Sequence, residues 1–372
     1  MDSRDRLLAS LGNGSFASVK CYVLCSGMIV AVKAYSREQV QNTGRVERVL
    51  KEKEILLRIS GQHCYFVCSL IETRKDEVNL YFVLEACLGG SLHKHLSIAG
   101  SFDITSARCY IAQLAAGLLY LSRRGVMHRD FKLNNVLLDK YGHVKICDFG
   151  SAKILYEAEA HKEVIDNGYN KAPKSFTLVG SLLHMSPEMI SKKFGYTICS
   201  DWYSLGVIAY ELLFGTMSSE NGRNGDNTNW QFISIEDINV NLKYECINAI
   251  EDYNHDNSSG MMSWGLHRLD TSKRHIRTSF DKEYADAIGF MSDLLIPNPA
   301  YRLGPFALHA LLNHDFLKSY KVDLDELLSL RDGSSMRSPN KDFDRRLGYL
   351  DVIYIDDVEA IKDIEQNLFN DF

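Results

Sequence analysis

The spacing of apolar residues changes near residue 85, and this change limits what the chain can fold into. Before it, short strand-forming runs dominate, interrupted by one stretch at 46–59 with apolar residues near helical spacing. After residue 90 the spacing is helical, first at 107–121 and then at 202–214, where the chain is apolar nearly all round. The sequence therefore predicts an α+β protein, with a small sheet carrying one helix and a larger, mainly helical part.

The first predicted helix has charged residues between its apolar ones, so it should bury one face only. Its apolar residues near helical spacing are Val46, Val49, Leu50, Leu56 and Leu57. Farther along, 216–280 is rich in Asn, Gly, Ser and Asp, which is typical of surface loops around a short helix.

Length and charge narrow the class of protein. A chain of 372 residues that is 45% hydrophobic is long enough for two cores. The net charge of -6 comes without a basic stripe, so nucleic acid is not expected as a partner. The first residues contain no apolar run of signal-peptide length, and no membrane insertion is expected. The sequence predicts a soluble, cytoplasmic protein, with access to the nucleus left open.

The nine cysteines are scattered and do not form paired CxxC units. Cys64 and Cys68 resemble half of a metal site, but no second pair completes it. The favoured interpretation of the cysteines is reduced core residues, and this includes Cys147.

Residues 11–19, LGNGSFASV, form a glycine-rich turn between two strand-like runs, where Gly12 and Gly14 let the backbone approach a phosphate. Downstream, an apolar run delivers a single lysine, Lys33. Glu52 on the predicted helix is a suitable partner for its ammonium group, and Glu47 and Glu54 on the same helix compete for that role.

The run at 127–138, MHRDFKLNNVLL, is the most specific signal in the chain. Asp130 can orient a hydroxyl and accept its proton, Lys132 can neutralise a phosphate, and Asn135 offers an amide oxygen to a metal. Ten residues on, Asp148 follows a strand-like run and is suited to holding Mg²⁺ against phosphates.

Together these stretches resemble the eukaryotic protein kinase superfamily. The resemblance implies a bilobal fold, with a kinase domain at 1–317, divided near residue 85 into an N-lobe (1–85) and a C-lobe (86–317). It also implies ATP and Mg²⁺ as cofactors and protein substrates as partners. By this resemblance Asp130 is the catalytic base, Asn135 and Asp148 are the metal ligands, and Lys33 pairs with Glu52.

The resemblance further implies an ATP site that includes the glycine-rich turn and a hinge at 85–87. Its expected residues are Leu11, Gly12, Asn13, Gly14, Ser15, Phe16, Ala17, Ser18, Val19, Ala31, Lys33, Leu84, Glu85, Cys87 and Leu137. In the larger lobe, Glu188 resembles a glutamate that pairs with an arginine at the position of Arg302, and Asp201 resembles an aspartate that holds the catalytic-loop backbone. Lys132, two residues after Asp130, resembles the serine/threonine form of the family.

Within the superfamily, the hinge sequence EACLGG at 85–90 is most similar to cyclic-nucleotide-dependent kinases of the AGC group. The group implies a C-terminal tail, here 318–372, whose terminal aromatics Phe369 and Phe372 dock on the small lobe. It also implies phosphorylation of Thr177, with the phosphate held by Arg129 and Lys153. An upstream activating kinase and a regulatory subunit are possible partners. Since 157–170 looks like an extra loop, it is expected to be disordered without that phosphate.

The expected substrate-binding residues are Ser181 and Glu211. Relatives that favour arginine-rich substrates have acidic residues where this chain has Ser91 and Asn134, so selection for basic substrates is expected to be weak. The sequence Leu182-Leu183-His184 departs from the family pattern. Two functions follow: an active serine/threonine kinase, favoured because Lys33, Asp130, Asn135 and Asp148 are all retained, and a catalytically silent kinase-fold scaffold or regulator.

Overall fold

The structure is a computed structural model that describes residues 5–13, 17–60, 64–215, 279–318 and 324–330. The chain separates into two compact units. The first comprises Met1–Lys94, Leu133–Lys153 and Ser329–Phe372, and the second comprises His95–Lys132 and Ile154–Leu328. Residues 133–153 group with the N-terminal segment because β8 pairs with β6 and β9 pairs with β8. A linear division of the sequence does not express this long-range pairing.

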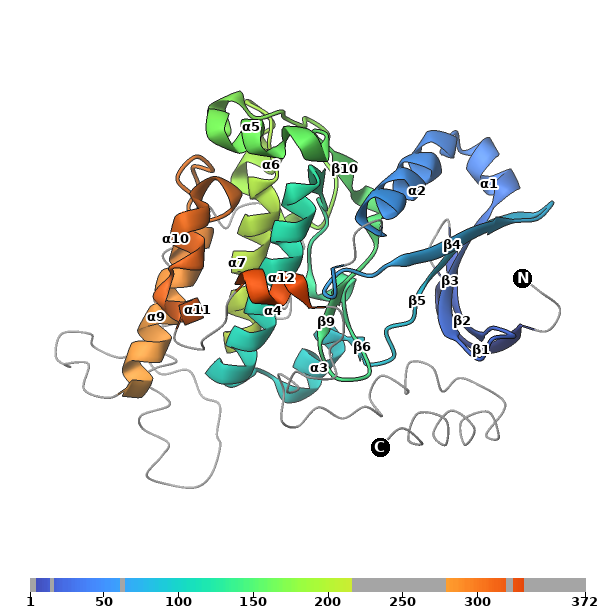
Figure 1. Cartoon of the computed structure of the whole chain (residues 1–372), viewed down its shortest axis with the longest axis horizontal. Coiled ribbons are helices and arrows are strands. Elements are labelled where there is room, and N and C mark those ends of the chain that lie inside the picture. Colours follow the sequence, from blue (N-terminus) through green and yellow to red (C-terminus); the bar gives the residue numbers. More distant parts are fainter. Residues whose placement is uncertain (1–4, 14–16, 61–63, 216–278, 319–323, 331–372) are drawn as a thin grey trace, which may run out of the picture. The chain divides into compact units, whose positions relative to one another are not determined.

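The first unit is built on an antiparallel five-stranded sheet in the order β1-β2-β3-β5-β4 (Figure 1). Its strands are β1 (Arg6–Asn13), β2 (Ala17–Val23), β3 (Ile29–Ser36), β4 (Leu70–Lys75) and β5 (Asn79–Glu85). A smaller sheet joins β6 (Gly90–Ser91), β8 (Val136–Leu138) and β9 (Val144–Ile146). Among its described residues this unit contains the α-helices α1 (Arg37–Asn42) and α2 (Val46–Ser60).

Helix α2 is the amphipathic helix that the sequence predicts, but its buried face differs from the expected one. The buried residues are Val49, Glu52, Ile55, Leu56 and Ile59. Val46, Leu50 and Leu57 are exposed. The buried set follows the 3.6-residue period from Val49, and it includes a glutamate, so apolarity alone did not identify the face.

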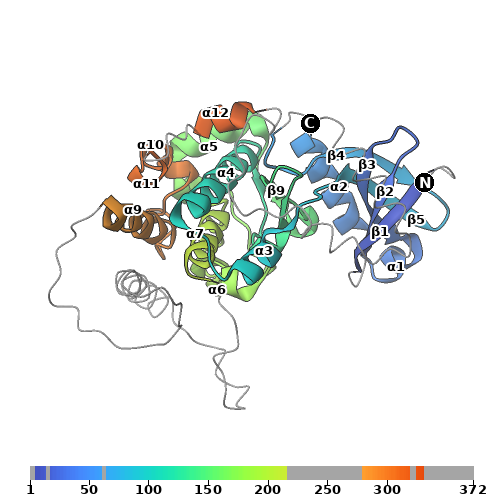
Figure 2. The same cartoon turned by 90° about the horizontal axis from the view of Figure 1, so that it is seen from below.

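The second unit is mainly helical, and α4, α7 and α9 lie side by side in it (Figures 1 and 2). Its helices are α3 (Leu92–Ala99), α4 (Ile104–Arg123), α5 (His161–Asn167), α6 (Pro187–Ser191), α7 (Cys199–Phe214), α9 (Ser279–Leu294), α10 (Leu308–Leu312), α11 (Asp315–Lys318) and α12 (Leu324–Ser329). The short strands β7 (Val126–Met127) and β10 (Lys153–Ile154) pair in a two-stranded sheet.

Helix α4 begins at an N-cap, Asp103, whose carboxylate accepts the backbone N–H groups of Thr105 and Ser106. It is buried almost along its whole length rather than on one face, because it packs against α7, α9 and α11. Helix α7 is buried from Cys199 to Leu213, as expected for a helix that is apolar nearly all round. With the antiparallel sheet in one unit and this helical core in the other, the predicted α+β fold class is confirmed.

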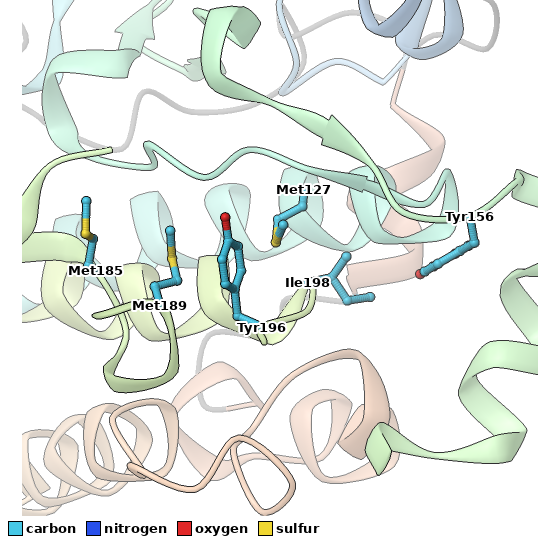
Figure 3. Close-up of a cluster of buried hydrophobic side chains, with 6 residues drawn as sticks. All are labelled: Met127, Tyr156, Met185, Met189, Tyr196 and Ile198. Atoms are coloured by element: carbon cyan, nitrogen blue, oxygen red, sulfur yellow. The ribbon is translucent and has the colours of Figure 1, made fainter. Parts of the chain in front are cut away.

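The loop at 157–170, expected to be disordered, is instead ordered and contains helix α5. Leu155, Ala160 and Val164 pack against a buried cluster, to which Phe306 also contributes. The cluster consists of Met127, Tyr156, Met185, Met189, Tyr196 and Ile198 (Figure 3). The loop is ordered because it carries apolar side chains that this cluster buries.

Candidate active site

A cavity of about 750 Å³ lies within the first unit. It is bounded by the ends of β1 and β2, by β3 and α2, by the hinge, and by the segments around β8 and after β9. Ten of the residues expected in the ATP site line it: Leu11, Gly12, Ala17, Val19, Ala31, Lys33, Leu84, Glu85, Cys87 and Leu137. Asn13 and Ser18 do not line the cavity, and Gly14, Ser15 and Phe16 lie outside the described residues.

Lys33 projects from β3 into this cavity between two carboxylates. Its Nζ lies 2.8 Å from Glu52 Oε1 and 2.9 Å from Asp148 Oδ1. Burial alone lowers the pKa of Lys33, but Glu52 and then Asp148 more than offset this effect, and the net pKa is raised. Lys33 is therefore a fixed cation in the cavity wall, and Glu52 is the helix carboxylate that pairs with it.

Tyr35 completes this pairing, and it was not anticipated from the sequence. Its hydroxyl donates to Glu52 Oε2 at 2.5 Å, which occupies the carboxylate oxygen that Lys33 leaves free. Burial, with further contributions from Glu52, raises the pKa of Tyr35. The strand period of two places Tyr35 on the same face as Lys33, and that was the signal available to find it.

Asn135 and Asp148 also line the cavity, and antiparallel pairing of β8 with β9 brings their segments together. The backbone N–H of Cys147 donates to the carbonyl oxygen of Asn135 at 2.9 Å. Asp148 has a φ of 61°, in the left-handed region, and half of its side chain is exposed. An amide oxygen and a carboxylate therefore lie in one cavity, and these are the ligand types that hard divalent cations prefer.

Among the described residues, no group of three or more His, Cys, Asp and Glu side chains is arranged to hold a metal ion by itself. Cys64 and Cys68 are both buried free cysteines.

In the second unit, the side chain of Asp201 holds the backbone of the loop that carries Asp130. The carboxylate of Asp201 accepts the backbone N–H groups of His128, at 2.7 Å, and Arg129, at 2.9 Å. Burial raises the pKa of Asp201, although His128 and the two N–H bonds oppose that effect. Arg129 has a φ of 68°, so the two hydrogen bonds fix a backbone conformation that a side-chain-bearing residue rarely adopts.

Asp130, Lys132 and Ser181 form a closed polar cluster. Lys132 Nζ lies 2.9 Å from Asp130 Oδ2 and 2.7 Å from Ser181 Oγ. The Ser181 hydroxyl donates to Asp130 Oδ1 at 2.9 Å. Gly180 has a φ of 109°, and a Cβ atom there would lie 2.2 Å from the carbonyl oxygen of Arg129, so only glycine lets this segment approach the loop.

Thr177 is exposed and contacts the same loop. The Arg129 guanidinium donates to Thr177 Oγ1 at 2.8 Å, and the Tyr196 hydroxyl donates to the carbonyl oxygen of Thr177. Tyr196, which the sequence did not single out, thus anchors the backbone at Thr177. Lys153 is half-buried and is the last residue of the segment Leu133–Lys153, which belongs to the first unit. Phe369 and Phe372 lie outside the described residues, and their docking stays a prediction.

Glu211 is buried in α7, and its carboxylate is already engaged. Glu211 Oε2 lies 3.0 Å from His184 Nε2. The hydroxyl of Ser204 donates to the carbonyl oxygen of His184 at 2.7 Å, which ties the same residue to α7 a second time. His184, one of the residues that depart from the family pattern, is therefore the partner of Glu211.

Comparison of the sequence with known proteins identifies the family. The family model described as "Protein kinase domain" matches residues 6–317, which is most of the chain. The chain belongs to the protein kinase family. The motifs that carried the resemblance in the sequence thus identified the family correctly.

The kinase is similar to proteins that are themselves named as protein kinases. It is 34% identical over 213 residues to a cGMP-dependent protein kinase of Drosophila melanogaster, isozyme 2 forms cD5/T2, which covers 57% of this chain and 21% of that protein. It is 33% identical over 210 residues to human cGMP-dependent protein kinase 2, covering 56% and 25%. It is 35% identical over 215 residues to a putative ribosomal protein S6 kinase alpha-2 of Caenorhabditis elegans, covering 56% and 26%.

These relatives confirm the resemblance to AGC kinases of the cyclic-nucleotide-dependent type. The chain spans only about a fifth to a quarter of the length of these three relatives. In the part of the chain that the structure describes, no helix is long and apolar enough to cross a membrane.

The pair expected at Glu188 and Arg302 is present in the second unit of the kinase. Arg302 Nη1 lies 2.6 Å from Glu188 Oε1, and Nη2 lies 2.9 Å from Oε2, a bidentate arrangement. The guanidinium also donates to the carbonyl oxygens of Ile296, Pro297 and Cys199. Every nitrogen of this buried cation is thereby matched with an acceptor.

Proposed function

We propose that this chain is an active, ATP-dependent serine/threonine protein kinase of the AGC type. The observation that carries the proposal is the Asp130 cluster, in which the carboxylate accepts a hydrogen bond from the Ser181 hydroxyl at 2.9 Å while Lys132 contacts both groups. A carboxylate that accepts an aliphatic hydroxyl proton beside a lysine ammonium group suits transfer of a phosphoryl group to serine or threonine.

ATP is the proposed ligand of the cavity in the first unit. Apolar residues from β1–β3 and Leu137 offer a surface for a base, and the hinge backbone offers donors and acceptors. Lys33, fixed by Glu52, would contact the α- and β-phosphates. Asn135 and Asp148 would hold Mg²⁺, which supplies charge neutralisation for the phosphates when bound.

Asp130 is proposed to orient the substrate hydroxyl and accept its proton as the oxygen attacks the γ-phosphorus of ATP, while the bond from that phosphorus to the β–γ bridging oxygen breaks and ADP leaves. Lys132 would neutralise charge that develops on the transferred group. Asp201 contributes by holding the loop backbone, so that the carboxylate of Asp130 keeps one orientation. Ser181 would leave Asp130 when a substrate hydroxyl replaces it.

The proposed regulation and partners follow from the same site. Phosphorylation of Thr177 by an upstream kinase would place a phosphate on Arg129, which already contacts the Thr177 hydroxyl, and Lys153 is proposed as a second partner. A substrate-binding role for Glu211 is proposed on the AGC resemblance alone, since its carboxylate is buried and paired with His184. A regulatory subunit, docking of Phe369 and Phe372, and a cytoplasmic location are proposed on the AGC resemblance alone.

The decisive experiment compares wild type with Asp130→Asn in transfer of radiolabelled phosphate from ATP to a peptide library containing Ser, Thr or Tyr acceptors. We expect wild type to label Ser and Thr peptides, and the variant to lose at least about 100-fold in kcat because a general base contributes about that much. Nucleotide binding by the variant should persist, since Asp130 is not among the cavity-lining residues.

Equal inactivity of both proteins after Thr177 phosphorylation, with nucleotide still bound, would favour the scaffold instead. Labelling of tyrosine peptides alone would contradict the serine/threonine assignment.

A further inference from the structure

One carboxylate in the cavity wall is neutralised from outside the cavity. Glu85, at the end of β5, lines the cavity, and its side chain is 30% exposed. Lys145 in β9 does not line the cavity, and its side chain is 1% exposed. The Lys145 Nζ lies 2.6 Å from Glu85 Oε1, so a lysine outside the cavity lining forms an ion pair with the hinge carboxylate.

The ammonium group of Lys145 is held by a second contact. It lies over the ring of Tyr65, 4.0 Å from the centroid, and the Tyr65 hydroxyl donates to the Asp139 carboxylate. Asp139 is itself fixed, because its Oδ1 accepts the backbone N–H groups of Tyr141 and His143. These contacts hold the ammonium group of Lys145 in one position beside Glu85.

Glu85 supports the hinge through backbone and side chain together. Its backbone N–H donates to the carbonyl oxygen of Ser69 at 3.0 Å, and its Oε2 accepts the Ser69 N–H at 3.3 Å. The Cys68 thiol donates to the Glu85 carbonyl oxygen at 3.6 Å. If the Glu85 carboxylate lost its counter-ion it would rotate toward water, and the hinge backbone would lose one of these restraints.

We propose that Lys145 is a positioning residue of the nucleotide pocket, which sets nucleotide affinity by neutralising Glu85 and holding the hinge in place. The inference rests on the proposed function, in which the cavity binds ATP. Two effects act in the same direction. An unpaired carboxylate on the wall repels a polyphosphate, and a displaced hinge presents its donors and acceptors poorly to a base.

The test measures ADP binding by calorimetry, together with the KM for ATP and kcat, in wild type and Lys145→Met. We expect the variant to raise the dissociation constant and the KM about tenfold, the effect of losing one charge-assisted hydrogen bond. The kcat should change much less, since Lys145 touches none of the proposed catalytic residues. The matched control is Lys140→Met, an exposed lysine five residues earlier, which should bind ADP as wild type does.

A double variant separates neutralisation from packing. In Glu85→Gln/Lys145→Met the hinge carries no charge, so most of the lost affinity should return. A purely structural role for the lysine stem would leave the double variant as weak as Lys145→Met. Lys145→Arg, which keeps the charge, should also bind more tightly than Lys145→Met.

The outcomes distinguish this inference from the proposed function. If wild type binds no ADP, the ATP site itself is wrong. If wild type binds ADP and Lys145→Met binds it equally well, or if Glu85→Gln restores nothing, the inference is overturned while the ATP site stands.

Discussion

Glu188 and Arg302 form an ion pair from which water is excluded, with side chains 10% and 0% exposed. Replacing Glu188 by Gln keeps the shape but leaves the guanidinium charge buried without its counter-ion. Removal of one partner from a buried pair costs about 3–5 kcal/mol, so we expect the free energy of unfolding to fall by that amount. Denaturant titration followed by tryptophan fluorescence would measure it.

The control for Glu188→Gln is Glu47→Gln, which removes the partner of Lys51 on α2. Those side chains are 86% and 69% exposed, and exposed pairs contribute about 0–1 kcal/mol. Equal effects of the two substitutions would contradict the assignment of Glu188 as part of a desolvated pair.

Short-range motifs allowed several site residues to be predicted, and long-range contacts account for those that were missed. Lys33, Glu52 and Asp148 were expected, and the structure brings the three together. Tyr35 and His184 were missed as partners because their roles depend on which carboxylates the fold places beside them. Spacing in a sequence reports residues on one element well, but it does not report the partner that packing supplies.

At the scale of elements, we expect the stability of helix α5 to depend on pH. His161, its first residue, stacks on Tyr156, whose hydroxyl lies 3.3 Å from His161 Nδ1. Burial, and then the charge of Arg123, lowers the pKa of His161 below its usual value near 6.5. Because the imidazole is a base whose pKa is lower in the folded state, the unfolded state binds a proton more readily. The neutral imidazole therefore favours the fold above the unfolded-state pKa, and this stability is lost as pH falls.

We therefore expect the hydrogen-exchange protection factors of 161–167 to fall between about pH 7 and about pH 5. The variant His161→Gln should lose most of this dependence. Helix α4 in the same unit serves as the internal reference. A dependence of equal size in the variant would show that another group titrates.

The same segment shows why order in this loop was not predicted. Its polar and charged residues suggested an exposed loop, whereas Leu155, Ala160 and Val164 are spaced so that they face one cluster. That cluster combines residues from 127 to 198 with Phe306, and no local pattern reveals such a surface. Packing also explains the exposed apolar residues of α2. The neighbouring elements cover the face that contains Glu52, and Val46, Leu50 and Leu57 lie outside that face.

On the scale of the whole molecule, the fold class and family could be read from the sequence because they depend on the order of elements and on contiguous motifs. The grouping of 133–153 with the first unit could not, because it depends on strand pairing across about 45 residues between β6 and β8. This pairing places Asn135 and Asp148 in the cavity with Lys33.

If the cavity binds nucleotide, ligand should stabilise the two units unequally. At about 100 times its dissociation constant, ADP should stabilise the unit that binds it by about 2.7 kcal/mol. Hydrogen exchange should therefore slow first in the cavity-lining segments of the first unit. Lys33→Met should weaken binding about tenfold or more, whereas Lys51→Met, an exposed lysine on α2, should not. Uniform protection of both units would contradict a site confined to the first.

Three thiols, those of Cys68, Cys87 and Cys147, line the cavity, and this bears on chemical probes for the kinase. The pKa of Cys87 is raised by its hydrogen bond with Cys68 and by burial, and the pKa of Cys147 is raised by burial. The thiolate is the reactive form, so these sulfurs react slowly with an electrophile free in solution. A covalent inhibitor would therefore depend on a long residence time in the cavity, and its selectivity would come from fit rather than from reactivity.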